Sequence, residues 1–349
     1  MAQYQAVVER GCLGQVGEYI PSKTHRIFIV TTRDVWSLYG EQMSTALAGR
    51  AFHPIFFAGG EQRKRLAEVE AMAGEMLALG GERSSLVVAF GGGIVTDLGG
   101  FLAAIFMRGI PVIHVPTTLL AQVDAAVGGK TGANLVGGKN LIGAFHQPLA
   151  VLIDPSVLGS LPEREYRAGL QEILKAGVIR SRPLFDVMAS RAGEVLAQQP
   201  GIVDEIIAES VRIKCEVVTA DEKEGGLRRI LNYGHTVGHA LEAETQYQLL
   251  LHGEAVAIGM RAANQLSLLC GTLSTGDCAR VNAAIAAYGP YPSVAHVPAE
   301  NLLARLGSDK KAVAGKVNFV LAQGIGDTKI VSGLDDATVL AAIRAALQP

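Results

Sequence analysis

Short apolar runs alternate with amphipathic segments along the first half of the chain. Five β-rich runs are expected to form buried strands: residues 25–32, 54–58, 85–90, 112–116 and 150–154. The segments at 35–48 and 61–79 lie between such runs and carry apolar residues at helical spacing. Strands that alternate with helices predict a parallel sheet covered by helices on both faces.

The pattern becomes mostly helical after residue 154. Leu161 opens a long region with few turn signals, and one late apolar run at 316–321 is expected to be a strand or an extended segment. A chain of 349 residues is long for one hydrophobic core. With a linker near 155–162, we expect an α/β domain at 1–158 and a mostly α-helical domain at 159–349.

Composition and charge narrow the class of protein. The formal net charge is -2 and no basic run occurs, so nucleic acid is not an expected partner. No apolar run reaches about 18–20 residues without a charge, so no membrane span is expected. The four cysteines lack C-x-x-C spacing and the N-terminus lacks a signal pattern, which indicates a cytoplasmic protein with reduced thiols. A mean hydropathy of +0.28 suits large buried interfaces, including one between subunits.

A glycine-rich turn follows the third expected strand. Gly91, Gly92 and Gly93 lead into an apolar segment whose first N–H groups, in a helix, would point at an anion. A diphosphate at this turn is the natural interpretation. A plain tight turn is the alternative, because the motif is not a strict G-x-G-x-x-G and lies in the third strand–helix unit.

Polar side chains suited to anions follow the next strand. Thr117 and Thr118 stand at its carboxyl end, where open α/β sheets bind ligands. Lys130 and Lys139 each lie beside a glycine pair in an expected loop, and Asn140 follows the second lysine. Such lysines either bind an anion or only solubilise the surface.

Histidines cluster in the helical region. His235 and His239 are four residues apart in a segment that can be helical, which places both imidazoles on one face, and His252 follows. Glu172 stands three residues before Lys175 on an otherwise apolar helix, a pair that is most often a surface ion pair. Two imidazoles and one carboxylate would alternatively make a divalent metal site. The spacing favours His235 with His239 as the ligand pair but does not separate it from His235 with His252.

Cationic residues precede the histidines. Arg228 lies four residues before Asn232 and seven before His235. On one continuous helix all three would share a face, with the cation beside the metal and aimed at an anionic substrate. The alternative is a solvated charged loop followed by a core helix.

These motifs, in this order, resemble the 3-dehydroquinate synthases of the shikimate pathway over nearly the whole chain. The matching segments are Gly60–Gln62, Gly91–Asp97, Phe106–Gly109, Pro116–Leu120, Val123–Lys130, Gly138–Asn140, Leu161–Pro162, Glu172–Lys175, Asn232–His239, His252–Glu254 and Asp309–Lys311. Thr96 stands where the family commonly has glycine, and Arg63 where an aromatic residue is common. Neither is a charged catalytic position.

The resemblance implies a Rossmann-like N-terminal domain that binds NAD and a helical C-terminal domain that holds one divalent metal, Zn²⁺ or Co²⁺. It also implies an active site in the cleft between the domains and a homodimer. The implied metal ligands are Glu172, His235 and His252. His239 then faces the substrate or supports a ligand.

The same resemblance implies the remaining site residues. Those expected to contact NAD are Asp34, Gly59, Gly60, Glu61, Gln62, Arg63, Lys64, Gly93, Ile94, Val95, Thr96, Asp97, Thr117, Thr118, Lys130, Lys139, Val157, Leu158, Gly159 and Ser160. Those expected to contact the substrate are Arg108, Asp124, Lys130, Asn140, Lys175, Lys214, Arg228, Asn232, His239 and Lys316. The expected catalytic residues are Lys130, Lys175, Lys214, Arg228, Asn232 and His239. Arg108 is expected to reach the phosphate of the neighbouring subunit's substrate.

The implied substrate is 3-deoxy-D-arabino-heptulosonate 7-phosphate, and the implied products are 3-dehydroquinate and phosphate. The family reaction oxidises the C5 hydroxyl with NAD, eliminates phosphate, reduces the ketone, opens the ring and closes a carbocycle by aldol addition, with no net redox change. Lys130, Asn140 and Lys316 are expected to hold the phosphate, and Lys214 with Arg228 the carboxylate.

Three other functions are compatible with parts of this pattern. They are a sugar phosphate cyclase of the valiolone or inosose type, a metal-dependent alcohol dehydrogenase, and a non-catalytic NAD-binding protein. The joint presence of Lys214, Arg228, Asn232 and His239 favours a dehydroquinate synthase over the first. The lysine-rich anion set argues against the second, and the full metal and anion set argues against the third.

Overall fold

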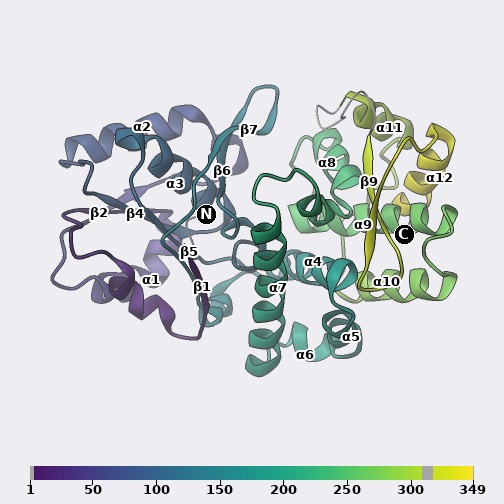
Figure 1. The fold of residues 1–349 in the computed structure, drawn as a ribbon, viewed down its shortest axis with the longest axis horizontal. Helices are drawn as coiled ribbons and strands as arrows, with labels where there is room; N and C mark the ends of the chain where they lie inside the picture. The colour runs from purple at the N-terminus through teal and green to yellow at the C-terminus, as the bar shows by residue number, and fades with distance from the viewer. Residues whose placement is uncertain (1–3, 309–316, 349) are drawn as a thin grey trace. The chain divides into compact units, whose positions relative to one another are not determined.

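The computed structural model describes residues 4–308 and 317–348 and divides into two compact units, Met1–Pro162 and Glu163–Pro349 (Figure 1). The first unit is an α/β domain and the second is mostly α-helical, so the predicted fold class is confirmed. The last residue of the first unit lies inside the linker expected at 155–162.

The first unit contains a six-stranded sheet of order β1-β8-β5-β4-β2-β3 in which every pair is parallel. Its strands are β1 Gln5–Val8, β2 Ile27–Thr31, β3 Phe52–Phe56, β4 Leu86–Gly91, β5 Val112–Pro116 and β8 Ala150–Ile153. The helices that follow β2, β3 and β4 are α1 Arg33–Ala46, α2 Leu66–Ala78 and α3 Gly93–Ile105. The five strands expected from apolar runs all form, and the short edge strand β1 is added to them.

Side chains of the central strands are buried on both faces of the sheet. Phe28 and Val30 of β2 belong to the core beneath α2 and α3, whereas Ile27 and Ile29 belong to the core beneath α1. Successive residues of a strand point to opposite faces, so both sets must be apolar when helices cover both. The continuous apolar runs in the sequence are the consequence of this double burial.

A hairpin lies between β5 and β8 in the chain and extends from the sheet of the first unit (Figure 1). Its strands, β6 Lys130–Leu135 and β7 Gly138–Phe145, are antiparallel, with a register shift between Ala133 and Leu135. The loops expected around Lys130 and Lys139 are therefore wrong, because both lysines lie on strands. Glycines that resemble loop residues instead allow close strand approach, since a Cβ on Gly143 would lie 2.0 Å from the Thr131 carbonyl oxygen.

The second unit contains nine α-helices and a two-stranded antiparallel sheet among its described residues. The helices are α4 Glu163–Arg180, α5 Arg182–Ser190, α6 Ala192–Leu196, α7 Pro200–Ala220, α8 His235–Glu244, α9 His252–Leu269, α10 Thr275–Ala287, α11 Ala299–Ser308 and α12 Asp336–Leu347. The strands are β9 Asn318–Ala322 and β10 Thr328–Ser332. The late apolar run thus forms a strand from Asn318 onward, and β10, which pairs with it, was not predicted.

Helix α9 packs against α4 on one side and α8 on another. Two glycines allow this close approach. A Cβ on Gly253 would lie 1.9 Å from the Ala168 carbonyl oxygen of α4, and a Cβ on Gly259 would lie 1.9 Å from the carbonyl oxygen of Gly234, just before α8. The backbones of three helices therefore meet at distances that a side chain would prevent.

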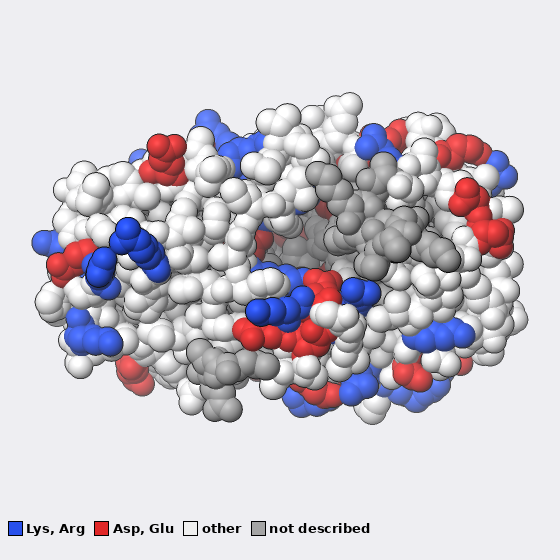
Figure 2. Space-filling model, turned by 45° about the horizontal axis from the view of Figure 1, so that its top comes forward, with Lys and Arg blue, Asp and Glu red and all other residues white. Residues whose placement is uncertain are grey.

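The surface carries both signs of charge. Figure 2 shows acidic and basic side chains interspersed on the face that it draws. None of the described helices is both long and apolar enough to cross a membrane.

Candidate active site

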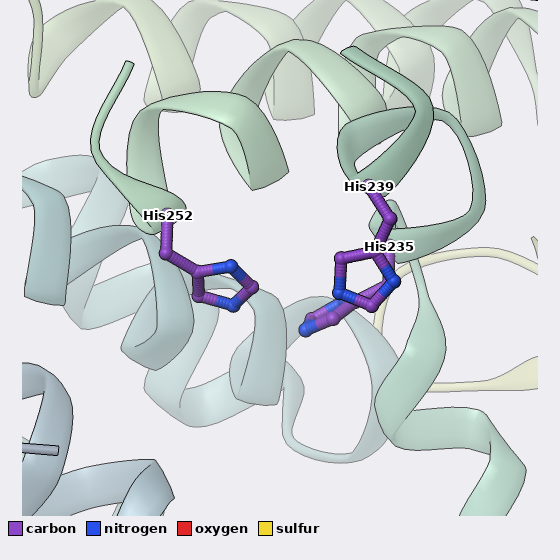
Figure 3. Close-up of side chains that lie close together, drawn as sticks. All are labelled: His235, His239 and His252. Carbon is purple, nitrogen blue, oxygen red and sulfur yellow. The ribbon is translucent and has the colours of Figure 1, made fainter. Parts of the chain in front are cut away.

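Three histidines of the second unit point toward one another (Figure 3). His235 begins α8, His239 lies one turn further along the same helix, and His252 begins α9. One nitrogen of each ring lies within 4.8 Å of the others. The ring centroids of His235 and His252 are 5.2 Å apart, as are those of His235 and His239. Sequence spacing predicts that His235 and His239 lie close together, and the packing of α9 adds His252 to them.

A carboxylate from α4 meets two of these rings. Glu172 Oε1 lies 3.5 Å from Nε2 of His235 and 3.5 Å from Nε2 of His252. Lys175, one turn further along α4, forms an ion pair with the other oxygen. The side chains of Glu172 and Lys175 are only 2% and 3% exposed, so the surface ion pair expected from their spacing is wrong.

The outer nitrogens of the same two rings face oxygen acceptors. His235 Nδ1 lies 3.2 Å from the Tyr233 carbonyl oxygen, and His252 Nδ1 lies 3.4 Å from Glu242 Oε2. A carbonyl and a carboxylate can only accept, so each Nδ1 carries the proton and donates it. In the metal-bound form each Nε2, which lies on the side of Glu172, would supply its lone pair to the ion. Two imidazole nitrogens and one carboxylate oxygen are a donor set that fits a divalent metal such as zinc.

Charge at this point favours a bound cation. Burial alone would raise the pKa of Glu172, but Lys175 and then His235 and His252 hold that pKa well below its usual range. Burial alone would lower the pKa of His252, but hydrogen bonds to Glu172 and Glu242 raise it to about 10. Two carboxylates thus surround one imidazole, and a proton or a metal ion is held strongly there.

An ion pair fixes the start of α9, where His252 lies. Glu254 accepts from the backbone N–H of Leu251 at 2.8 Å and from Arg164 Nε at 2.7 Å and Nη2 at 2.8 Å. Arg164 Nη2 also donates to the Leu249 carbonyl oxygen at 2.9 Å. The segment before His252 is therefore held at both its N–H and C=O groups.

The predicted continuous helix from Arg228 to His235 is wrong. A 3₁₀ turn covers Leu227–Asn232, and α8 begins only after Gly234, which has a left-handed φ of 77°. Arg228 is nevertheless buried, and its Nη1 donates to the Glu222 carbonyl oxygen at 2.5 Å. Glycine at 234 both ends the turn and permits the contact with α9.

The loop before this turn is built around one carboxylate. Asp221 accepts from the backbone N–H groups of Gly225 at 2.8 Å, Gly226 at 2.6 Å and Arg228 at 3.0 Å. These bonds, led by that of Gly226, lower the pKa of Asp221. Asn232 Nδ2 donates to Glu224 Oε1 at 2.7 Å. The loop is thus held by Asp221, with Lys223, Gly225 and Gly226 exposed and Arg228 buried at its end.

The residues expected to contact NAD gather at one edge of the sheet. Parallel strands end at the same edge, and the following residues lie in the segments after β2, β3, β4, β5 and β8: Asp34, Gly59 to Lys64, Gly93 to Asp97, Thr117 and Thr118, and Val157 to Ser160. The Thr117 backbone N–H donates to the Gly91 carbonyl oxygen at 3.0 Å, which joins the glycine turn to the threonine pair. Among the described residues no side chain caps the start of α3; the N–H groups of Val95 and Thr96 donate to the Gly92 carbonyl oxygen, and those of Gly93 and Ile94 suit an anion.

Polar side chains near this edge form a second cluster. Lys64, only 4% exposed, pairs with Asp97 and donates to Asn140 Oδ1 at 2.6 Å. The Glu61 carboxylate oxygen Oε2 lies 3.8 Å from the Lys139 ammonium nitrogen Nζ. The hairpin therefore brings residues 139 and 140 beside residues from the ends of β3 and β4.

The other expected residues are more dispersed. Asp124 lies in a short π-helical turn, Ala121–Ala125, and Lys130 is exposed at the start of β6. Lys214 is buried on α7. Arg108 and its neighbour Met107 both adopt left-handed φ values, 68° and 50°. Lys316 lies outside the described residues, as do the lysines of the 309–311 motif.

Glu242 was missed by the sequence analysis, although a signal was present. It lies three residues after His239 and seven after His235, so helical periodicity places all three on one face of α8. Only the position of His252, which sequence spacing does not fix, reveals what Glu242 contacts.

Comparisons with known proteins identify the family of the chain. Family models described as 3-dehydroquinate synthase N-terminal and C-terminal match residues 54–168 and 169–312. A 3-dehydroquinate synthase of Solibacter usitatus (strain Ellin6076) is 62% identical over 344 residues, which cover 99% of this chain and 96% of the relative.

Solved structures of related cyclases have the same fold. A 2-epi-5-epi-valiolone synthase from Streptomyces hygroscopicus subsp. jinggangensis 5008, with NAD⁺ and Zn²⁺ bound, has a TM-score of 0.88 at 31% identity, covering 99% of this chain and 97% of that one. A 2-deoxy-scyllo-inosose synthase complexed with carbaglucose-6-phosphate, NAD⁺ and Co²⁺ has a TM-score of 0.87 at 25% identity. The match covers 98% of this chain and 96% of that one. By its family models and its relatives, the chain belongs to the 3-dehydroquinate synthase family of NAD- and metal-dependent cyclising lyases.

Proposed function

We propose that this enzyme converts 3-deoxy-D-arabino-heptulosonate 7-phosphate to 3-dehydroquinate and phosphate with one divalent metal held by Glu172, His235 and His252. The observation that carries the proposal is the approach of Glu172 Oε1 to both histidine Nε2 atoms at 3.5 Å. Zn²⁺ and Co²⁺ both suit two nitrogens and one oxygen. Three protein ligands leave room for substrate oxygens, as in catalytic sites.

The protein's own groups prepare this site. When bound at these residues, the metal would supply Lewis-acid activation of substrate hydroxyls, and NAD would supply reversible hydride transfer. Lys175 offsets the charge of Glu172, and the outer partners of His235 and His252 keep both Nε2 lone pairs available. His239 shares the face of α8 with His235 but is assigned to the substrate rather than to the metal.

Cations of the second unit are proposed to hold the substrate carboxylate. Arg228 is 2% exposed and Lys214 8% exposed, and in so little water each attracts an anion strongly. The planar guanidinium of Arg228 can bind both oxygens of a carboxylate, and Asn232 lies on the same 3₁₀ turn. Lys130, Asn140 and Lys316 are assigned to the phosphate.

The first unit is proposed to bind NAD at the carboxyl edge of its sheet. The uncapped start of α3 suits a diphosphate, and the cluster of Lys64, Asp97, Glu61 and Lys139 lies where the segments after β3 and β4 meet the hairpin. NAD⁺ is bound in both the valiolone and the inosose synthase, which supports the same cofactor here.

We further propose a homodimer that uses the hairpin of the first unit. Leu135, Val136, Leu141 and Phe145 are exposed on β6, β7 and the turn between them, with Val136 97% exposed. Exposed apolar side chains grouped in this way are typical of interfaces. Arg108, held in a strained left-handed conformation, is assigned to the neighbouring subunit's substrate.

Purified enzyme with NAD and Co²⁺ or Zn²⁺ tests the reaction. The expected result is release of phosphate from the heptulosonate phosphate without accumulation of NADH. Accumulating NADH would indicate a dehydrogenase. Faster turnover of a heptulose 7-phosphate that lacks the carboxylate would indicate a cyclase of the valiolone type. Absence of phosphate release from the authentic substrate would overturn the proposal.

A further inference from the structure

Glu242 is a buried carboxylate whose side chain contacts the candidate metal centre from outside. The residue is 2% exposed, lies on α8, and holds its Oε2 3.4 Å from His252 Nδ1. Helix α8 therefore contributes two residues to the centre. His235 belongs to the histidine cluster, and Glu242 contacts the imidazole of His252 on α9. Burying a carboxylate costs free energy, so a partner is required.

The contact controls which nitrogen of His252 is available. A carboxylate accepts only, so Nδ1 of His252 carries a proton, and in the metal-bound form Nε2 supplies its lone pair to the ion. That lone pair is on the side of Glu172, whose Oε1 is 3.5 Å from Nε2. With the opposite tautomer, Nε2 would carry a proton and could not bind a metal.

The two histidines have different outer partners. His235 Nδ1 faces the neutral carbonyl of Tyr233, whereas His252 Nδ1 faces the charged carboxylate of Glu242. Hydrogen bonds to a charged acceptor are about twice as strong as neutral ones. A carboxylate partner also makes the imidazole a better electron donor to a metal.

A second carboxylate on the same helix supplies the comparison. Glu244 accepts from Asn301 Nδ2 at 2.7 Å and from Arg305 Nε at the edge of the unit. Its partners belong to α11 and not to the histidine cluster. Glu244 is thus a matched residue of the same type and helix, with a structural ion pair instead of a contact to His252.

We propose that Glu242 is a positioning residue that fixes the tautomer and orientation of His252 and strengthens it as a metal ligand. The inference rests on the proposed ligand set of Glu172, His235 and His252. Glu242 does not itself bind the metal.

Metal affinity tests the proposal without relying on turnover. The metal-free protein would be titrated with Co²⁺ or Zn²⁺ against a chelator of known affinity, and the visible spectrum of the Co²⁺ form recorded. Loss of an outer carboxylate typically costs about 10- to 100-fold in metal affinity. We expect a loss near the lower value for Glu242→Gln, which keeps an acceptor oxygen, and near the upper value for Glu242→Ala. The Co²⁺ spectrum should change in both variants, and Glu244→Gln should match the wild type.

The outcomes separate this inference from the ligand set. If His252→Ala loses the metal but Glu242→Gln and Glu242→Ala keep wild-type affinity and spectrum, Glu242 has no positioning role. If His252→Ala keeps the metal, the ligand set itself fails, and the inference fails with it. Melting of each metal-free variant is measured in parallel. Glu242→Gln has nearly the same size as the native side chain, so its altered affinity at an unchanged melting temperature supports the proposal.

Discussion

A single added methyl group at Gly253 should move His252 on α9 away from Glu172 on α4. Gly253 follows His252 at the start of α9 and lies against Ala168 of α4. Ala168 stands one helical turn before Glu172 on the same helix. A Gly253→Ala substitution that moves α9 away from Ala168 therefore also moves His252 away from Glu172.

The size of the displacement follows from the contact. A Cβ on Gly253 would lie 1.9 Å from the Ala168 carbonyl oxygen, where ordinary contacts begin at 3.4 Å. The nearest three atoms are all backbone, so the helices must separate by up to 1.5 Å. Metal–ligand distances tolerate only about 0.2 Å. We expect metal affinity to fall by at least about 100-fold, with a loss of about 1–3 kcal/mol in unfolding free energy from overpacking.

Chelator competition on the metal-free variant measures the affinity, and urea unfolding measures the stability. Gly74→Ala in α2 is the matched control, because a Cβ there meets no atom within 4 Å. It should keep wild-type affinity and gain about 0.5–1 kcal/mol, since alanine loses less backbone entropy on folding. A folded Gly253→Ala protein that binds metal as tightly as the wild type would refute the reasoning.

Three other predictions address separate residues. His252→Ala should abolish metal binding and activity, whereas His239→Ala should keep most of the metal and slow turnover; the reverse pattern in metal analysis would contradict the ligand assignment. Arg228→Lys should raise the KM for substrate about 10- to 100-fold, because lysine keeps the charge but loses the two-pronged hydrogen bond, and an unchanged KM would remove Arg228 from the carboxylate site. Burial, and then His146, lower the pKa of His114 to about 3, so the stability that neutral His114 contributes is present above pH 6.5 and is lost as the pH falls toward 3. The unfolding free energy of His114→Leu should therefore change less steeply with pH than that of the wild type over this range, by up to about 1.4 kcal/mol per pH unit. Equal slopes for the two proteins would contradict this.

Much of the first unit could be predicted because its strands are buried on both faces. Phe28 and Ile29 point to opposite sides of the sheet, yet both lie in cores, and such strands have an unmistakable apolar run. The β6–β7 hairpin was missed for the opposite reason. Its glycines resemble loop residues, and Leu141 and Phe145 are exposed rather than buried.

The candidate site was predictable in its residue types but not in its geometry. Spacing favours His239 over His252 as the partner of His235, and only packing shows that His252 lies 3.5 Å from Glu172. Burial of Glu172 depends on helices far away in the sequence, so its ion pair looked like a surface pair. The left-handed Gly234 separates Arg228 from α8, although the periodicity of the sequence continues across it.

The central claim is that Glu172, His235 and His252 hold the metal, and anomalous X-ray diffraction from crystals of the Co²⁺- or Zn²⁺-loaded enzyme tests it most directly. The account predicts one strong anomalous peak at about 2.0–2.2 Å from Nε2 of both histidines and from a Glu172 oxygen. His252 Nδ1 should remain within hydrogen-bonding distance of Glu242. A peak bound by His239 in place of His252, or one away from Glu172, would contradict the account.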